Sequence, residues 1–338
     1  MEQSRRKATV MADLNRHPFR WPWWLRNPHL QTLGARCVRR LEHRPLTLER
    51  WQTPDKDFLR IHSFSGREDK PVALLLHGLE GSAQSNYIVG LTKRLSVLSW
   101  SVFVMEHRSC GGEMNRARRM YHSGETTDLA FVIDTLSQRH PSNPIYLAGF
   151  SLGGNQTAKW LGESGDSVSP NLKAAAVVSA PYDLAVSGQR MDRGFHRAYV
   201  RHFLRTLIPK AETKERQYPG CIDMEAVRRS TTFEEFDTHA TAALHGFRDA
   251  ADYYDKVSCG QFLPGIRRPT LLISAADDPF NPSSTLPRES AAQSPFLHPL
   301  FPSRGGHVGF IRRARKHRVG YWAEEQIVRF FSACEMLG

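Results

Sequence analysis

The stretch that most constrains this chain is residues 144–160. A short apolar run at 145–148 is followed by Gly149-Phe150-Ser151-Leu152-Gly153 and then by a segment of helical character. This order predicts a strand, a sharp turn and a helix, with Ser151 at the tip of the turn. A glycine on each side of the serine suits this geometry, because the strand and the helix pass too closely there for side chains. The turn would push the Ser151 hydroxyl above a sheet, with the helix N-terminus behind it.

The segments around this turn alternate between apolar strands and amphipathic helices. The predicted strands are 71–76, 101–106, 145–148, 173–179, 269–274 and 298–301, and the predicted helices are 87–98, 127–136, 152–161 and 321–331. Two earlier segments, 46–51 and 58–63, are typical of paired antiparallel strands. Continuous apolar strands that alternate with helices predict an α/β fold, with a mostly parallel central sheet flanked by helices.

The alternation breaks between about residues 182 and 264. Helical patterns appear there at 195–207 and 232–254, without a clear strand. We interpret this interruption as a helical cap inserted into a single domain of residues 18–338. Residues 1–17 are polar, and we expect them to be disordered.

Composition excludes several classes of protein. The net charge is +12, but the basic residues are spread along the chain, and we find no signature of nucleic-acid recognition. Five scattered cysteines without a CxxC pair predict neither a disulfide framework nor a metal site. We find no secretory signal and no apolar run long enough to span a membrane, so we expect a cytoplasmic protein.

A tryptophan-rich segment, Trp21-Pro22-Trp23-Trp24, lies near the N-terminus. Its rings could anchor the segment on the domain, line a pocket or touch a membrane interface. We favour packing on the domain, with peripheral membrane contact as the alternative.

Ser151 needs a base to take its proton and a carboxylate to orient that base. In a fold with this turn the expected order along the chain is serine, acid, histidine. The predicted strand 269–274 runs into Asp277-Asp278-Pro279, and His307 follows in the glycine-rich loop Gly305-Gly306-His307. We predict His307 as the base and favour Asp278 as the acid, because a proline-containing turn follows it directly. Asp277 is the alternative.

The negative oxygen that forms during such a reaction needs two backbone amides. One would come from Leu152, directly after the serine. The other would come from Leu79 in His77-Gly78-Leu79-Glu80-Gly81, which follows the apolar strand 71–76. His77 is expected to brace this turn rather than to transfer protons.

These motifs resemble the α/β-hydrolase superfamily, and within it the YheT-like branch related to the ABHD-type membrane-associated hydrolases. The resemblance covers nearly the whole chain from about Pro18. It rests on Asn27-Pro28-His29-Leu30-Gln31-Thr32, His77-Gly78-Leu79-Glu80-Gly81-Ser82, His107-Arg108-Ser109-Cys110-Gly111-Gly112, Tyr121-His122-Ser123-Gly124, Gly149–Gly154, Asp277-Asp278-Pro279-Phe280 and Gly305–Phe310. It implies Ser151, Asp278 and His307 as catalytic residues. The branch often has Arg-Gly where this chain has Arg108-Ser109. For Tyr121-His122-Ser123-Gly124 we favour a structural role, the capping of the 127–136 helix.

The sequence therefore predicts a serine hydrolase that cleaves carboxylic esters through an acyl-serine intermediate, without a metal or organic cofactor. The expected partner is a small-molecule or lipid ester. An alcohol O-acyltransferase or a phospholipid esterase could use the same three residues, and a non-catalytic interaction module is the remaining alternative.

Overall fold

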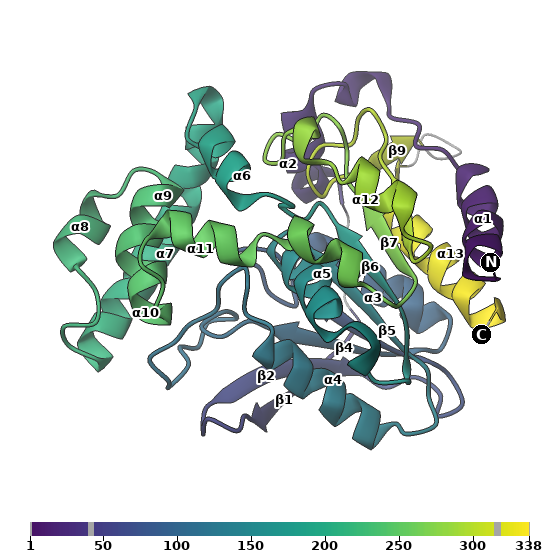
Figure 1. The fold of residues 1–338 in the computed structure, drawn as a ribbon, viewed down its shortest axis with the longest axis horizontal. Helices are drawn as coiled ribbons and strands as arrows, with labels where there is room; N and C mark the ends of the chain where they lie inside the picture. Colours follow the sequence, from purple (N-terminus) through teal and green to yellow (C-terminus); the bar gives the residue numbers. More distant parts are fainter. Residues whose placement is uncertain (1, 40–43, 314–318, 338) are drawn as a thin grey trace.

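The computed structural model describes residues 2–39, 44–313 and 319–337. Its strands are β1 (Thr47–Gln52), β2 (Phe58–Phe64), β3 (Val72–Leu76), β4 (Ser101–Glu106), β5 (Ile145–Phe150), β6 (Leu172–Val178), β7 (Thr270–Ile273), β8 (Leu297–Leu300), β9 (Ile311–Arg313) and β10 (Val319–Tyr321). In the described residues, the first eight form one sheet in the order β1-β2-β4-β3-β5-β6-β7-β8 (Figure 1). The strands from β4 to β8 in this order are parallel, whereas β1 and β2 pair antiparallel to their neighbours. The predicted α/β fold and the predicted antiparallel pair are therefore confirmed.

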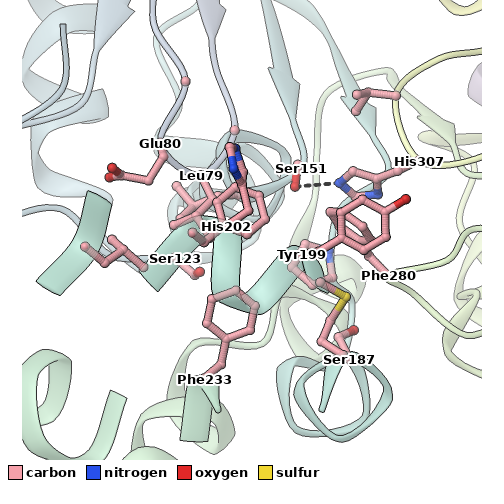
Figure 2. Close-up of a pocket in the computed structure, with 18 of the residues that line it drawn as sticks. Leu79, Glu80, Ser123, Ser151, Ser187, Tyr199, His202, Phe233, Phe280 and His307 are labelled. Carbon is pink, nitrogen blue, oxygen red and sulfur yellow. Dashed lines mark hydrogen bonds between the residues drawn. The ribbon is translucent and has the colours of Figure 1, made fainter. Parts of the chain in front are cut away.

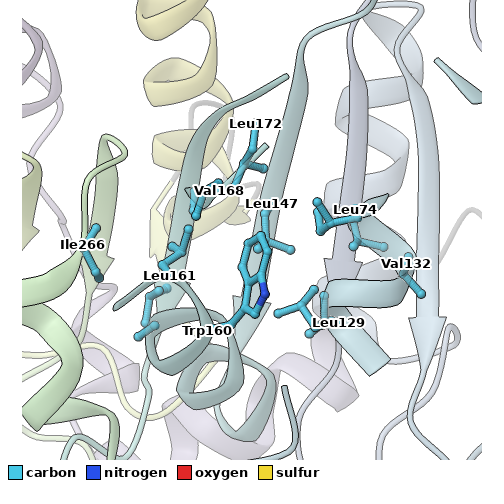
Figure 3. Close-up of a cluster of buried hydrophobic side chains, with 14 of the residues drawn as sticks. Leu74, Leu129, Val132, Leu147, Trp160, Leu161, Val168, Leu172 and Ile266 are labelled. Carbon is cyan, nitrogen blue, oxygen red and sulfur yellow. The ribbon is translucent and has the colours of Figure 1, made fainter. Parts of the chain in front are cut away.

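Helices cover both faces of the sheet because its strands are apolar on both sides. Leu74 contributes to the core beneath α4 (Thr127–Arg139) and α5 (Leu152–Ser164), where Trp160 packs (Figure 3). Leu75, one residue further along β3, points to the opposite core beneath α3 (Asn86–Val97) and α13 (Trp322–Leu337). This alternation follows from the two-residue period of a strand.

The N-terminal segment is a helix, α1 (Glu2–Asn15), and not the disordered tail that the sequence predicted. Val10 and Leu14 lie four residues apart and are buried in the same core as α13. The side chain of Gln326 on α13 donates a hydrogen bond to the carbonyl oxygen of His17, at 2.7 Å. The two termini consequently lie side by side in Figure 1. An apolar pair in a mostly polar segment was too weak a signal to predict this docking.

The segment between β6 and β7 is helical, as predicted. Its helices are α6 (Leu184–Met191), α7 (Arg197–Gln217), α8 (Met224–Arg229), α9 (Phe233–Phe236), the π-helix η4 (Asp237–Ala242), α10 (Ala243–His245) and α11 (Ala250–Val257). These elements lie beside the carboxyl ends of the strands in Figure 1, and we call them the cap. The stretch 232–254 is not the continuous helix that its pattern suggested, because Gly246 takes a positive φ of 77° and ends α10.

The tryptophan-rich segment forms η1 (Trp23–Leu25) and leads into α2 (Pro28–Val38). Trp21 packs partly against the core, as expected. The prediction of packing is wrong for Trp23, which is 80% exposed, and for Trp24, which is also exposed. Only Leu25 of η1 is buried, so the short helix turns the other two rings outward. A further helix, α12 (Arg288–Gln293), precedes β8.

Candidate active site

Ser151 occupies the turn between β5 and α5 in a strained backbone conformation, with φ of 53° and ψ of −117°. Such a conformation is rare for a residue with a side chain. The tight turn also needs the flanking glycines. A Cβ on Gly149 would lie 2.2 Å from the carbonyl oxygen of Gly153, and a Cβ on Gly153 would lie 2.6 Å from that of His77. The amide of Ser151 donates to the carbonyl oxygen of Val178 on β6, at 2.8 Å, which fixes the turn above the sheet.

The structure brings the three predicted side chains into one hydrogen-bonded line. His307 Nε2 lies 2.8 Å from Ser151 Oγ, and His307 Nδ1 lies 2.8 Å from Asp278 Oδ2 (Figure 2). An ionised carboxylate can only accept, so Nδ1 carries a proton and Nε2 is free to accept the serine proton. Asp278 is buried, and its other oxygen accepts from the amide of Phe280 at 2.8 Å.

The neighbouring Asp277 is held differently. Its Oδ1 accepts from the amide of Gly306 at 3.0 Å, so it supports the loop that carries His307. Burial raises the pKa of the Asp277 carboxyl above its ordinary value. Of the two aspartates that the sequence left open, Asp278 is the one in contact with the imidazole.

Helix α2 holds the histidine loop from the other side, which the sequence did not predict. The amide of His307 donates to Thr32 Oγ1 at 3.0 Å. Gln31 is fully buried, and its side-chain amide exchanges two hydrogen bonds with the backbone of Ile311, at 2.9 and 3.1 Å. A Cβ on Gly309 would lie 1.9 Å from the carbonyl oxygen of Gln31, so helix and loop are in close contact. The available signal was the motif that ends in Gln31-Thr32.

The two predicted backbone donors face the same region. Leu152 is the first residue of α5, where amides have no partner within the helix. Leu79 lies in the loop after β3. Within the described part of the chain, neither amide donates to another protein group. Both residues line the cavity that also exposes Ser151, so their amides are available for a ligand.

Two buried histidines brace the Leu79 loop. His77 Nδ1 lies 2.8 Å from the carbonyl oxygen of Gly78, and its Nε2 accepts from the amide of His107 at 3.2 Å. The ring of His107 in turn lies 2.8 Å from the carbonyl oxygen of His77. Burial lowers the pKa of His77 well below its ordinary value and that of His107 to about 4, so both rings are neutral at pH 7. His77 therefore has the bracing contacts that the sequence suggested.

The loop is also joined to the cap. Glu80 takes a positive φ of 53°. Its carboxylate accepts from Tyr121 at 2.7 Å and from Lys210 on α7 at 2.6 Å. Because Lys210 belongs to the cap, this ion pair ties α7 to the loop that presents the Leu79 amide.

The prediction that Tyr121-His122-Ser123-Gly124 caps α4 is wrong. Glu125 does so, since its carboxylate accepts from the amides of Thr127 and Asp128 at 2.6 and 3.1 Å. The segment instead packs on the serine-bearing helix. Asn155 of α5 donates to the carbonyl oxygen of Ser123 at 2.8 Å.

The motif around Arg108 supports the fold and does not line the cavity. Arg108 is buried and binds three carboxylates, those of Asp55, Asp57 and Asp128, at 2.7 to 2.9 Å. Ser109 takes a φ of 64°, a conformation that glycine adopts at no steric cost. In this chain Ser109 Oγ donates to Asn115 Oδ1 at 2.6 Å.

Ser151 opens into a cavity of about 440 Å³ between the sheet and the cap. Figure 2 shows Tyr199 and Phe280 beside His307, with Phe233 of α9 on the cap side. The apolar side chains that line it are Leu33, Leu79, Met120, Leu152, Leu184, Met191, Tyr199, Phe203, Leu207, Phe233, Phe236, Tyr253, Tyr254, Phe280 and Val308. The lining is therefore mostly apolar, with polar side chains both beside Ser151 and on the cap, where Asp237 and Thr241 lie.

Comparison with known proteins shows the family to which this chain belongs. Residues 71–314 match the α/β hydrolase fold family, and the chain belongs to this family. Similar proteins include YheT of Escherichia coli, whose name carries the word esterase. It is 37% identical over 309 residues, which cover 89% of each chain.

Two further relatives are longer than this chain. The phospholipase ABHD3 of Homo sapiens is 30% identical over 243 residues, and the monoacylglycerol lipase of Saccharomyces cerevisiae is 27% identical over 269 residues. The alignments cover 72% and 77% of this chain but only 59% of each relative. Among solved structures, the esterase Pf2001 of Pyrococcus furiosus has a TM-score of 0.56 at 16% identity, over 86% of this chain and 92% of that one. The predicted family and fold are thus confirmed.

No three of the histidine, cysteine, aspartate and glutamate side chains that the structure describes are grouped to hold a metal ion. Among the helices so described, none combines the length and hydropathy needed to cross a membrane.

Proposed function

We propose that this protein is a serine hydrolase of carboxylic esters. The observation that carries the proposal is the line from Ser151 Oγ through His307 to Asp278, with both hydrogen bonds at 2.8 Å, at the edge of an apolar cavity. The names of the relatives, which include esterase, phospholipase and lipase, support ester chemistry.

The proposed reaction has two steps. His307 Nε2 accepts the proton of Ser151 while Oγ attacks the ester carbonyl, and the amides of Leu79 and Leu152 stabilise the negative oxygen. Asp278 keeps the proton on Nδ1 and stabilises the charged imidazole. The C–O bond then breaks, the alcohol leaves with the proton from His307, and an acyl-serine remains. Water then attacks the acyl carbonyl while His307 takes its proton, the bond between the acyl carbon and Ser151 Oγ breaks, the proton returns to Oγ, and the carboxylic acid is released.

The cavity favours an ester with an apolar acyl chain. Aromatic and aliphatic side chains of α7 and α9, among them Phe203 and Phe233, line most of the cap side of the cavity. The carboxyl of Asp237 also lines it, and burial raises the pKa of this group to about 6. Burial of each methylene in such a wall contributes about 0.8 kcal/mol. We therefore expect kcat/KM to rise with acyl length until the cavity is full.

A series of p-nitrophenyl esters from acetate to laurate tests the proposal with the purified protein. Ser151→Ala should lower turnover by at least about 10⁴-fold and abolish labelling by a fluorophosphonate probe, because the nucleophile is gone. Ser164→Ala, at the other end of α5, is the matched control and should retain both.

Unchanged turnover in Ser151→Ala would contradict the proposal. Absence of labelling in the wild-type protein would favour the interaction module. Addition of ethanol separates hydrolysis from transfer, since an ethyl ester as the main product would identify an acyltransferase that uses the same serine.

A further inference from the structure

Exposed apolar side chains gather on η1, on α2 and at the start of the cap. Of the ten large hydrophobic side chains that the described residues expose, five come from two short segments. They are Trp23, Trp24, Leu30, Leu33 and Phe195. We call this set the apolar patch. Isolated exposed apolar residues need no explanation, but a cluster marks an interaction surface.

The two segments meet although they are far apart in the sequence, since His29 and Tyr199 are 170 positions apart. The ring of His29 on α2 lies 5.0 Å from that of Phe195, and its Nδ1 lies 3.0 Å from the hydroxyl of Tyr199 on α7. In Figure 1, α2 lies beside the α6 end of the cap. Leu33 links the patch to the cavity, because it is exposed and also lines the cavity.

Arginines flank these apolar groups in the sequence. Arg20 and Arg26 flank η1, and Arg193 and Arg197 flank Phe195; all four are exposed. In the part of the chain that the structure describes, none of the four forms an ion pair with a carboxylate. Their charge is therefore available to an external anion.

We propose that the apolar patch and these arginines dock the protein on an anionic lipid bilayer. Tryptophan and phenylalanine rings insert at the level of the lipid headgroups, and each nearby arginine attracts anionic lipids. A membrane fits this surface better than a protein partner, because two exposed indole rings with unpaired arginines around them match an anionic interface. With the apolar patch against the bilayer, the side of the cavity that Leu33 lines would face the membrane. The proposal goes beyond ester hydrolysis and does not depend on it.

Co-sedimentation with vesicles tests the proposal without any catalytic step. We expect the full-length protein to bind vesicles of phosphatidylcholine with 30% phosphatidylglycerol, and to bind pure phosphatidylcholine much more weakly. Trp23→Ser with Trp24→Ser should weaken binding at least tenfold. The matched control, Val97→Ser with Leu98→Ser, removes two exposed apolar groups from the end of α3 and should bind like the wild type.

A second pair of variants tests the charges. Arg193→Gln with Arg197→Gln should weaken binding at least tenfold at low salt, since one arginine contributes about fivefold. Arg228→Gln with Arg229→Gln removes the same charge from α8, which lies at the far end of the cap from α2 in Figure 1, and should have little effect.

Equal loss in the test and control variants, or no binding of the wild type to anionic vesicles, would overturn the proposal. A wild-type dimer that Trp23→Ser with Trp24→Ser converts to a monomer would also overturn it and assign the surface to a second copy of the chain. Turnover of p-nitrophenyl butyrate without vesicles is measured in parallel. All four double variants should keep it, so a failure of docking is distinguished from a failure of the proposed chemistry.

Discussion

Two adjacent aspartates should differ sharply in their effect on activity. Asp278 contacts His307 Nδ1, whereas Asp277 accepts from the amide of Gly306 in the histidine loop. Asp278→Asn should therefore lower kcat/KM for p-nitrophenyl butyrate by about 10⁴-fold, because an amide no longer favours the tautomer that leaves Nε2 free. Asp277→Asn, the matched control, should stay within about tenfold of the wild type. An equal loss in both variants would show that the assignment of the acid is wrong.

At the scale of single residues, the sequence predicted the positions that a local pattern marks. Ser151 and His307 lie between glycines, and the structure places them 2.8 Å apart. The sequence alone did not decide between Asp277 and Asp278 as the acid, because the answer depends on which carboxylate faces an imidazole 29 residues away. Nor could it predict that Thr32 binds the amide of His307, since no local pattern connects residues 275 positions apart.

The junction of β5 and α5 allows a prediction at the scale of elements. Gly149→Ala should destabilise the fold by at least about 1–3 kcal/mol, because its Cβ would overlap the backbone of α5 and the contact cannot relax without moving the helix. Gly188→Ala is the control on α6. Its Cβ would find no atom closer than 3.7 Å, so it should be neutral or slightly stabilising. Thermal unfolding of both variants measures the difference, and equal melting temperatures would contradict the strained junction.

Helices and strands could be predicted where burial imposes a single pattern of apolar residues. Strands β3 to β6 are buried along nearly their whole length and read as apolar runs, so their limits were predicted within two residues. The cap was predicted only as helical. Its π-helix was not predicted, because the spacing of apolar residues does not distinguish a π-helix from an α-helix. The break at Gly246 was missed although a glycine with positive φ commonly ends a helix. Helix α1 was missed because its stability comes from contact with α13, at the other end of the chain.

At the scale of the whole molecule, the site depends on contacts that join distant layers. The cap meets the sheet domain at the Lys210–Glu80 ion pair, and α2 meets the histidine loop at Thr32. Glu106 provides a third junction at the end of β4. Its carboxylate binds Arg60 of β2 at 2.9 Å and accepts from the amide of Ala83, in the loop after β3, at 3.0 Å. Loss of such a junction should therefore lower the stability of the complete fold rather than that of one element.

Glu106 should therefore contribute to the resistance of the protein to acid. Burial opposes its ionisation, but the His62 ring, 3.2 Å away, and hydrogen bonds from Ala83 and Arg60 prevail and lower its pKa from 4.5 to about 2. Because the folded state holds the proton more weakly than the unfolded state, the stabilisation is complete above pH 4.5 and is lost as the pH falls toward 2. Allowing for partial solvent screening, it amounts to about 2 kcal/mol.

Urea unfolding at pH 7 and at pH 4 measures this contribution. Glu106→Gln should lower the free energy of unfolding by about 2 kcal/mol at pH 7 and by less at pH 4, because the wild-type protein has by then begun to lose the same stabilisation. Glu225→Gln is the control, since this carboxylate is 80% exposed on α8 and should change stability by under about 0.5 kcal/mol at either pH. A deficit of Glu106→Gln that stays constant between the two pH values would show that Glu106 acts through packing and not through its charge.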